Sequence, residues 1–164
     1  MRVGIGYDIH RLEEDRELIL GGIRIPFELG LAGHSDADVL VHSICDALLG
    51  ALALGDIGQH FPDTDTQYRG ISSLILLKKV KSLIQSRGFV VNNVDTIIIA
   101  QKPKLASFIP AMRDNIARTL GIAVDCVSVK ATTAERLGSI GQGKGIAAEA
   151  VVSVRQTKSP FDKL

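Results

Sequence analysis

Residues 34–46 hold two histidines and three aspartates, the densest group of residues with chemical potential in the chain. Ser35 and Asp38 form a capping-box-like pattern, S-x-x-D, and apolar residues then recur at helical spacing. We therefore predict a helix from about Asp36 to Leu52 with Ser35 as its N-cap. Because residues four apart are neighbours on a helix, three polar side chains share one face: Asp38, His42 and Asp46.

His34 and Ser35 fall at the amino-terminal end of this helix, where free backbone N–H groups attract anions. They could bind an oxyanion, although capping by Ser35 alone also explains that residue. Asp46 lies one turn beyond His42 and could orient its imidazole, or it could be an ordinary exposed carboxylate. Both alternatives stay open.

Asp8 and His10 supply the rest of a metal site. Residues 3–10 alternate in the manner of a strand, which places these two side chains on the same face. With His42 they make a two-histidine, one-carboxylate set. Catalytic zinc sites commonly have three protein ligands and leave a fourth position open. A single histidine is more often structural, so the combination carries the prediction of zinc.

Two later segments could bind phosphate, hydroxyls or a second cation. One is a Gly- and Pro-containing loop with three aspartates, which could also be turn formers: Asp56, Asp63 and Asp65. The other follows a predicted strand and offers hydroxyls and a carboxylate: Thr132, Thr133 and Glu135. Glu135 could ligate a hard ion such as Mg²⁺, or it could complete a capping box with Thr132.

The elements that must position these residues alternate between strands and helices. We predict a hairpin turning at Gly21-Gly22 and further strands over about 93–101, 127–131 and 146–155, with helices over about 71–87 and 107–120. The fold class is α/β of the α+β type, a single domain with a mixed β-sheet and helices on one face. We place the domain at residues 1–156 and expect 157–164 to be a frayed tail.

The composition of the chain disfavours several classes of protein. Hydrophobic residues make up 46% of the 164, which is typical of a folded globular chain. The net charge is +1 and aromatic residues are 4%, which disfavours nucleic-acid binding. No apolar run approaches the roughly 20 residues of a membrane span. Two cysteines form no disulfide framework. Since Met1 leads directly into a strand, we expect no signal peptide and a cytoplasmic location, or a plastid-like one if a transit peptide has been removed.

Several motifs together resemble one family, the 2-C-methyl-D-erythritol 2,4-cyclodiphosphate synthases of the non-mevalonate isoprenoid pathway. They follow one another in register to about Val154. The matching segments are Gly6-Tyr7-Asp8-Ile9-His10, Gly33-His34-Ser35-Asp36-Ala37-Asp38, Asp46-Ala47-Leu48-Leu49-Gly50, Gly55-Asp56-Ile57-Gly58, Phe61-Pro62-Asp63-Thr64-Asp65, Ala100-Gln101-Lys102-Pro103-Lys104 and Lys130-Ala131-Thr132-Thr133.

The resemblance implies a lyase that converts 4-diphosphocytidyl-2-C-methyl-D-erythritol 2-phosphate to the cyclic diphosphate and CMP. It also implies a homotrimer with active sites between subunits. By similarity, one Zn²⁺ per subunit is held by Asp8, His10 and His42. His34 and Thr133 resemble the transition-state stabilisers. Glu135 would hold Mg²⁺ or Mn²⁺ through the diphosphate.

The same resemblance implies the substrate contacts. His34 and Ser35 would contact the diphosphate, and Asp8 and His10 would also bind the substrate. The methylerythritol portion would be surrounded by Asp56, Ile57, Gly58, Phe61, Pro62, Asp63, Thr64 and Asp65. The cytosine would be bound by Ala100, Gln101, Lys102, Pro103, Lys104 and Leu105. The phosphates would also contact Thr132, Thr133 and Glu135.

The chain departs from the family pattern near its end. Ala134 replaces a usual threonine, Ser139 an aromatic residue, and Gln142 an arginine that is linked in the family with an isoprenoid diphosphate on the trimer axis. Because Gln142 removes that charge, we expect such binding to be weak or absent. Two alternatives remain for the chain as a whole: a zinc-dependent nucleotide-diphosphate hydrolase, and a non-catalytic trimeric module that binds isoprenoid phosphates.

Overall fold

Five strands form one mixed sheet in the order β4-β1-β7-β5-β6 in the computed structural model, which describes residues 1–157. The strands are β1 (Arg2–Glu13), β4 (Gly30–Leu31), β5 (Phe89–Ile99), β6 (Val127–Thr132) and β7 (Gly145–Gln156). Only β5 and β6 pair in parallel; the other neighbours are antiparallel. The predicted hairpin is confirmed as β2 (Leu18–Leu20) and β3 (Ile23–Ile25). The expectation of a single domain with a mixed sheet is therefore confirmed.

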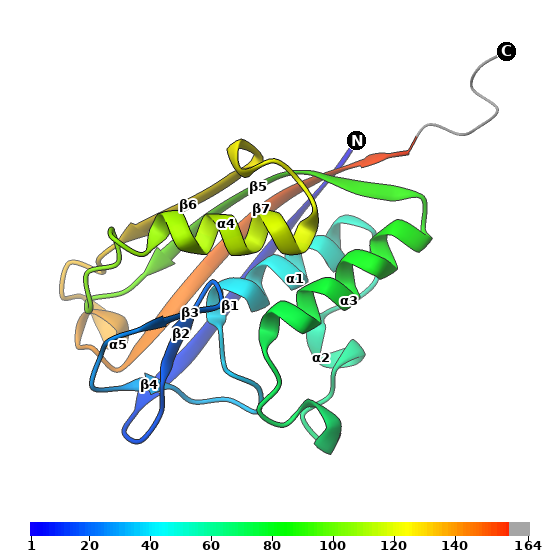
Figure 1. Ribbon diagram of the computed structural model, residues 1–164. Helices are drawn as coiled ribbons and strands as arrows, with labels where there is room; N and C mark the ends of the chain where they lie inside the picture. The colour runs from blue at the N-terminus through cyan, green and yellow to red at the C-terminus, as the bar shows by residue number, and fades with distance from the viewer. Residues whose placement is uncertain (158–164) are drawn as a thin grey trace, which may run out of the picture.

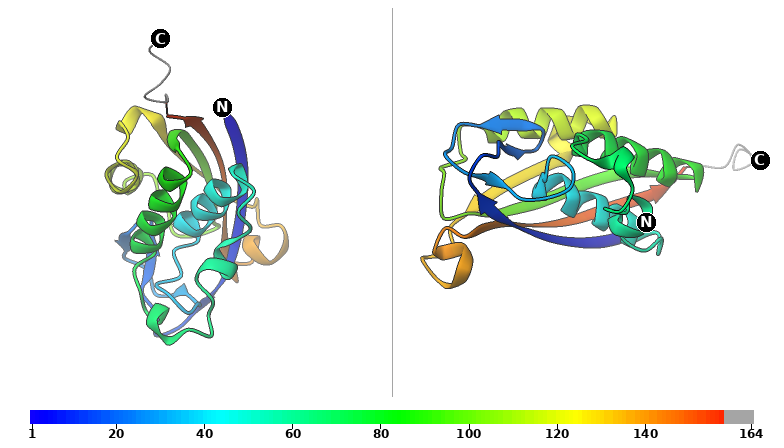
Figure 2. Two further views of the ribbon diagram at one scale, coloured as in Figure 1. Left: turned by 90° about the vertical axis from the view of Figure 1, so that its right-hand side faces the viewer. Right: turned by 90° about the horizontal axis from the view of Figure 1, so that it is seen from below.

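Three long helices cover one face of this sheet (Figure 1). They are α1 (Val39–Ala51), α3 (Ser73–Ser86) and α4 (Ile109–Leu120), and the buried apolar side chains lie between them and the strands. Short helical turns occupy the connections: α2 (Ile57–His60), η1 (Thr66–Tyr68), η2 (Val124–Cys126) and α5 (Gly138–Gly141). Figure 2 shows α5 on the opposite side of the sheet from α1 and α3. None of the helices in the described part of the chain has the length and apolar character needed to cross a membrane.

Helix α1 lies unusually close to strand β1 because two glycines face it. A Cβ on Gly6 would lie 2.7 Å from the backbone nitrogen of Ala47, and one on Gly4 would lie 2.6 Å from that of Ala51. Any side chain at these positions would push the helix away. The close approach brings His42, which α1 carries, onto the strand that carries Asp8 and His10.

The other face of β1 is apolar and exposed. Val3, Ile5, Tyr7 and Ile9 alternate with the glycines and with the Asp8–His10 pair, and between 47% and 72% of each side chain is exposed. Val151 on the neighbouring strand β7 is 46% exposed. Contiguous exposed apolar surface of this kind is typical of a face that packs against another protein.

The start of α1 differs from the prediction. The helix begins at Val39 rather than near Asp36, and its N-cap is Asp38, not Ser35. Asp38 Oδ1 accepts a hydrogen bond from the backbone N–H of Val41 at 3.1 Å, while Oδ2 accepts one from Gly22 in the hairpin turn at 2.7 Å. One buried carboxylate therefore satisfies both the helix end and the hairpin. Asp38 accordingly caps the helix instead of sharing a face with His42 and Asp46.

The other predicted elements are confirmed with shifted ends. Helix α3 begins at Ser73 and α4 at Ile109, and α4 ends before Gly121, which adopts the left-handed conformation expected of a helix terminator. Strand β5 begins at Phe89, earlier than predicted, because its first residues pair with the end of β7. The tail that we predicted to fray lies, from residue 158 on, outside the described residues.

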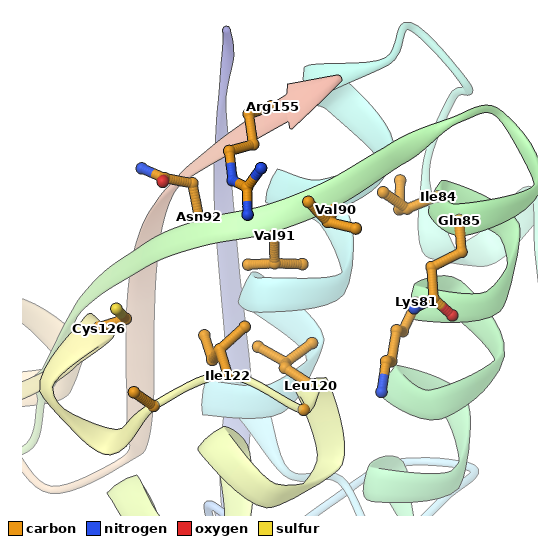
Figure 3. A pocket seen from close by; sticks show the side chains of 12 residues that line it. Lys81, Ile84, Gln85, Val90, Val91, Asn92, Leu120, Ile122, Cys126 and Arg155 are labelled. Carbon is orange, nitrogen blue, oxygen red and sulfur yellow. The ribbon is translucent and has the colours of Figure 1, made fainter. Parts of the chain in front are cut away.

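A cavity of about 400 Å³ opens where β5 begins and β7 ends, between the last turns of α3 and α4 (Figure 3). Its lining includes Lys81 and Arg155. Lys81 Nζ lies 3.4 Å from the carbonyl oxygen of Thr119, in the last turn of α4. This cation thus helps to satisfy a helix carboxyl end. The cavity is at the opposite end of the sheet from His10, which pairs with Ile146 at the start of β7.

Candidate active site

Asp8, His10 and His42 converge on a single point. Asp8 Oδ2 lies 2.9 Å from His10 Nε2 and 3.1 Å from His42 Nδ1, and the two nitrogens are 3.3 Å apart. Strand alternation supplies the first two residues, and the close packing of α1 supplies the third. The structure therefore brings together the three residues that the sequence predicts as metal ligands.

The spacing of these atoms fits a small metal ion. Zinc bound tetrahedrally at about 2.0–2.1 Å keeps its ligand atoms about 3.3 Å apart, and the three atoms here lie 2.9, 3.1 and 3.3 Å from one another. Burial raises the pKa of Asp8, but hydrogen bonds with His10 and His42 outweigh it and hold that pKa well below its usual range. Burial lowers the pKa of His10, and Asp8 overcomes this and raises it. The Asp8 carboxylate thus attracts positive charge to this point, and a metal cation bound there would replace the proton on His10.

The second ring nitrogen of His42, Nε2, lies within hydrogen-bond distance of two serine hydroxyls. His42 Nε2 lies 2.8 Å from Ser73 Oγ and 3.1 Å from Ser35 Oγ. The Ser73 hydroxyl in turn donates to Asp36 Oδ1, and its backbone N–H donates to Asp36 Oδ2 at 3.0 Å. Hydrogen bonds to the non-ligating nitrogen fix the orientation of a metal-binding imidazole. The alternative in which Asp46 plays this part is not what the structure shows, since Asp46 Oδ1 accepts from the backbone N–H of Ile57 at 2.7 Å.

A pocket of about 290 Å³ opens beside the three ligands. It is lined by His10, Gly33, His34, Ser35, His42, Ile57, Gly58, Phe61, Asp63, Tyr68 and Leu76. Of the predicted loop residues, Ile57, Gly58, Phe61 and Asp63 thus reach it. Pro62 and Thr64 are exposed and not among its lining residues. Tyr68 and Leu76 also line it, and nothing in their spacing singled them out.

The other two loop aspartates, Asp56 and Asp65, make hydrogen bonds within their own turns. Asp56 Oδ1 accepts from the backbone N–H of Gln59 at 2.9 Å and caps α2, while Asp65 Oδ1 accepts from that of Gln67 at 3.1 Å and caps η1. Those hydrogen bonds hold the pKa of each carboxyl below its usual range. The turn-forming alternative therefore describes both residues in this structure. The Asp65 carbonyl oxygen lies 3.3 Å from His34 Nε2, which ties this loop to the site.

The loop from Phe61 to Tyr68 is fixed to helix α3 by a cation. The two rings meet edge to face with centroids 5.4 Å apart, and Lys79 Nζ lies 5.0 Å from the Tyr68 ring and 5.9 Å from the Phe61 ring. Both distances fall within the range of cation–π attraction. Helix α3 thus positions the loop as well as His42.

The predicted cytosine and phosphate residues gather in a second pocket of about 290 Å³. Its lining consists of Ala100, Gln101, Pro103, Lys104, Leu105, Ala106, Ile109, Ala131, Thr132 and Thr133. Thr133 Oγ1 donates to Glu135 Oε1 at 2.7 Å. Neither Lys102 nor Glu135 is among the lining residues. No helix begins at Thr132, so the capping-box alternative for Thr132 and Glu135 is wrong.

The two pockets lie at the same end of the sheet on separate strands. His10 on β1 pairs with Ile146 of β7, and Ile99 at the end of β5 pairs with Ala147. Strand β7 thus stands between them, and the two linings share no residue. Each pocket holds part of the predicted residue set.

Comparison with known proteins shows which family has this arrangement. The sequence model described as the YgbB family matches residues 1–155. The chain belongs to the YgbB family. A 2-C-methyl-D-erythritol 2,4-cyclodiphosphate synthase from Alkaliphilus metalliredigens is 62% identical over 157 residues, which cover 96% of this chain and 99% of the relative. The same-named protein of Desulforamulus reducens is 58% identical over 156 residues, 95% of this chain and 99% of the relative.

Solved structures agree with the sequence comparison for this YgbB family chain. IspF of Plasmodium falciparum in a CDP complex matches with a TM-score of 0.84 at 37% identity, over 96% of this chain and 97% of that one. The bifunctional IspDF of Campylobacter jejuni matches with a TM-score of 0.92 at 43% identity, over 96% of this chain and 42% of that one. The family predicted from the motifs is therefore confirmed.

Proposed function

We propose that the chain is a phosphorus-oxygen lyase of isoprenoid precursor synthesis, a 2-C-methyl-D-erythritol 2,4-cyclodiphosphate synthase. It would convert 4-diphosphocytidyl-2-C-methyl-D-erythritol 2-phosphate to the cyclic diphosphate and CMP. The observation that carries the proposal is the facing set of Asp8, His10 and His42 in a chain 62% identical to a synthase of that name over 96% of its length.

The reaction needs no nucleophile from the protein. An oxygen of the 2-phosphate bonds to the β-phosphorus while the bond from that phosphorus to the bridging oxygen breaks, and the electron pair leaves with CMP. The protein's task is to hold the two phosphates in line and to offset their charge. Zn²⁺ held by Asp8, His10 and His42 would supply a Lewis acid for the diphosphate.

The remaining roles follow the predicted residue set. His34 and Ser35 border the metal pocket and would bind diphosphate oxygens, with His34 and Thr133 stabilising the charge that develops in the transition state. The loop lining with Ile57, Gly58, Phe61 and Asp63 would enclose the methylerythritol portion. The Ala100–Leu105 segment would bind the cytosine, and Thr132 and Thr133 the phosphates. Glu135 would hold Mg²⁺ or Mn²⁺ with the diphosphate.

We propose a homotrimer in which the two pockets of different subunits form each active site. Two observations support it: the two parts of the residue set lie in separate pockets, and the outer face of β1 is apolar and exposed. Sedimentation velocity should give a trimer for the chain, and Ile5→Lys, which puts a charge on that face, should give smaller species. A monomeric wild type would contradict the assembly.

The reaction is tested by ³¹P NMR of the zinc- and magnesium-supplied protein with the cytidyl substrate. We expect CMP together with a cyclic diphosphate, and no product with His42→Ala, which removes one ligand. CMP with a linear phosphate product would instead identify a zinc-dependent nucleotide-diphosphate hydrolase. No turnover by the wild type would refute both activities and favour a binding module.

A further inference from the structure

A fourth cavity lies against the pocket beside Asp8, His10 and His42, and it shares three residues with that pocket. It measures about 520 Å³ and is lined by Arg16, Gly33, His34, Ser35, Thr66, Arg69 and Gly70. Gly33, His34 and Ser35 also line the pocket beside the metal ligands. The lining contains two arginines and no carboxylate, so this cavity is positively charged where it borders the candidate catalytic residues.

The backbone places Arg69 firmly beside His34. The N–H of Gly70 donates to the carbonyl oxygen of His34 at 2.8 Å, and the N–H of Asp36 donates to that of Ile71 at 3.0 Å. These two hydrogen bonds pair the segment 34–36 with the segment 70–71, which directly follows Arg69. The guanidinium is therefore carried by a segment whose distance from His34 is set by hydrogen bonds.

Arg16 reaches the same cavity from the turn before β2. Gly30 on β4 allows this, because a Cβ there would lie 2.5 Å from the carbonyl oxygen of Arg16. Arg24 pairs with Glu17 at 3.0 Å. By contrast, neither cavity arginine makes an ion pair with any residue in the 1–157 range. Both charges are thus available to a ligand.

We propose that Arg16 and Arg69 form a phosphomonoester subsite that binds the 2-phosphate of the substrate. The inference rests on the proposed function and adds two binding residues to its site. A phosphomonoester carries nearly two negative charges at neutral pH, and the guanidinium fork suits phosphate oxygens in pairs.

The position of the cavity explains why this phosphate and not the diphosphate would bind there. Two of the three candidate metal ligands, His10 and His42, line the pocket beside the metal site, where the electrophilic phosphorus is expected. The attacking phosphate must lie close to that phosphorus while its repulsion by the diphosphate is offset. His34 and Ser35 line both cavities. The bond between the 2-phosphate oxygen and the β-phosphorus would therefore form beside these two residues.

Steady-state kinetics of Arg69→Gln and Arg16→Gln test the subsite. We expect each variant to raise KM for the full substrate about tenfold, as loss of a charged hydrogen bond would, while the Ki of CDP as a competitive inhibitor stays within about twofold. Arg69→Lys, which keeps the charge without the fork, should recover part of the loss. Arg87→Gln removes an exposed arginine at the far end of α3 and should change neither value. Parallel increases in KM and in the Ki of CDP, or no change in KM, would overturn the subsite.

A binding measurement separates the subsite from the reaction. NMR titration of 2-C-methyl-D-erythritol 2-phosphate, which has no leaving group, is compared with titration of unphosphorylated 2-C-methyl-D-erythritol. We expect the arginine variants to lose affinity about tenfold for the phosphorylated compound alone. If the wild type makes no cyclic product yet this pattern holds, the proposed function fails and the phosphomonoester site stands. Equal affinities in the wild type and both variants would refute the site, whatever the enzyme catalyses.

Discussion

Nε2 of His42 lies 2.8 Å from the hydroxyl oxygen of Ser73, the first residue of helix α3. Since Nδ1 of the same ring faces Asp8, the proton on the imidazole belongs on Nε2 when Nδ1 binds a metal. His42 then donates to Ser73, which donates to Asp36. A serine placed between an imidazole and a carboxylate thus fixes both the tautomer and the orientation of one metal ligand.

Removing this hydroxyl should weaken metal binding without removing a ligand. We expect Ser73→Ala to lower zinc affinity about tenfold, as substitutions behind metal-binding histidines do. Competition for zinc with a chromophoric chelator measures the change. Ser72→Ala is the matched control, since Ser72 precedes α3 and its side chain makes no capping hydrogen bond. Equal zinc affinities for the two variants would contradict this role of Ser73.

Lys79 should hold the loop that covers the metal pocket. Lys79→Met keeps the length of the side chain but removes the charge above Phe61 and Tyr68. Because an exposed cation–π contact contributes about 0.5–1 kcal/mol, we expect amide hydrogen exchange across residues 61–68 to rise about two- to fivefold. Lys78→Met, one residue earlier and exposed, provides the control. Unchanged exchange in Lys79→Met would show that the loop is held by its own turns.

Asp38 should make stability depend on pH. Burial, together with the nearby charge of Asp36, raises its pKa from 3.8 to about 6, against the hydrogen bonds from Gly22 and Val41 that lower it. The folded chain therefore binds this proton more tightly than the unfolded chain, so the stabilisation is complete below about pH 4 and is lost as pH rises through 6. We expect Asp38→Ala to cost about 2–4 kcal/mol through the lost cap and an unpaired Gly22 N–H.

Urea unfolding at a fixed protein concentration checks this expectation. The difference between wild type and Asp38→Ala should be larger at pH 5 than at pH 8. Asp114→Ala, which removes an exposed carboxylate from α4, should show a small difference at both pH values. A difference for Asp38→Ala that grows toward pH 8 would show that the carboxylate folds in its charged form.

Gln142 should limit binding of isoprenoid diphosphates. It is exposed at the carboxyl end of α5 and carries no charge, whereas the resemblance given in the sequence analysis implies an arginine at this position. We expect calorimetric titration with geranyl diphosphate to give weak or no binding to the wild type, and Gln142→Arg to increase it. Tight binding by the wild type would refute this expectation.

The sequence predicted the residues of the candidate metal site because two simple periods define them. Alternation along β1 places Asp8 with His10, and the helical pattern after residue 38 identifies the element that carries His42. Ser73 could not be assigned in the same way, because it reaches His42 from another helix, 31 residues away. Arg16 and Arg69 were missed for the same reason, because contacts distant in sequence bring them to one cavity: the segments paired around His34 place Arg69, and the close approach of Gly30 places Arg16.

The N-cap of α1 was predicted wrongly for a reason that is visible in the structure. Ser35 fits the capping pattern, but its hydroxyl accepts from the backbone N–H of Ala37 and lies beside His42 instead. Asp38 takes the cap because the hairpin turn at Gly22 also needs an acceptor. Ser and Asp are similarly favoured as N-caps. The additional hydrogen bond with Gly22, which is distant in sequence, therefore selects Asp38.

Strand β1 carries the candidate metal ligands Asp8 and His10 on one side and Tyr7 and Ile9 on the other. A one-residue slip in the register of this strand would exchange its two sides and so remove both features at once. Whatever protein packs on Tyr7 and Ile9 would press on the backbone that holds Asp8 and His10. Metal affinity and subunit association would then be coupled. Diluting the protein until its subunits separate would therefore also release the metal.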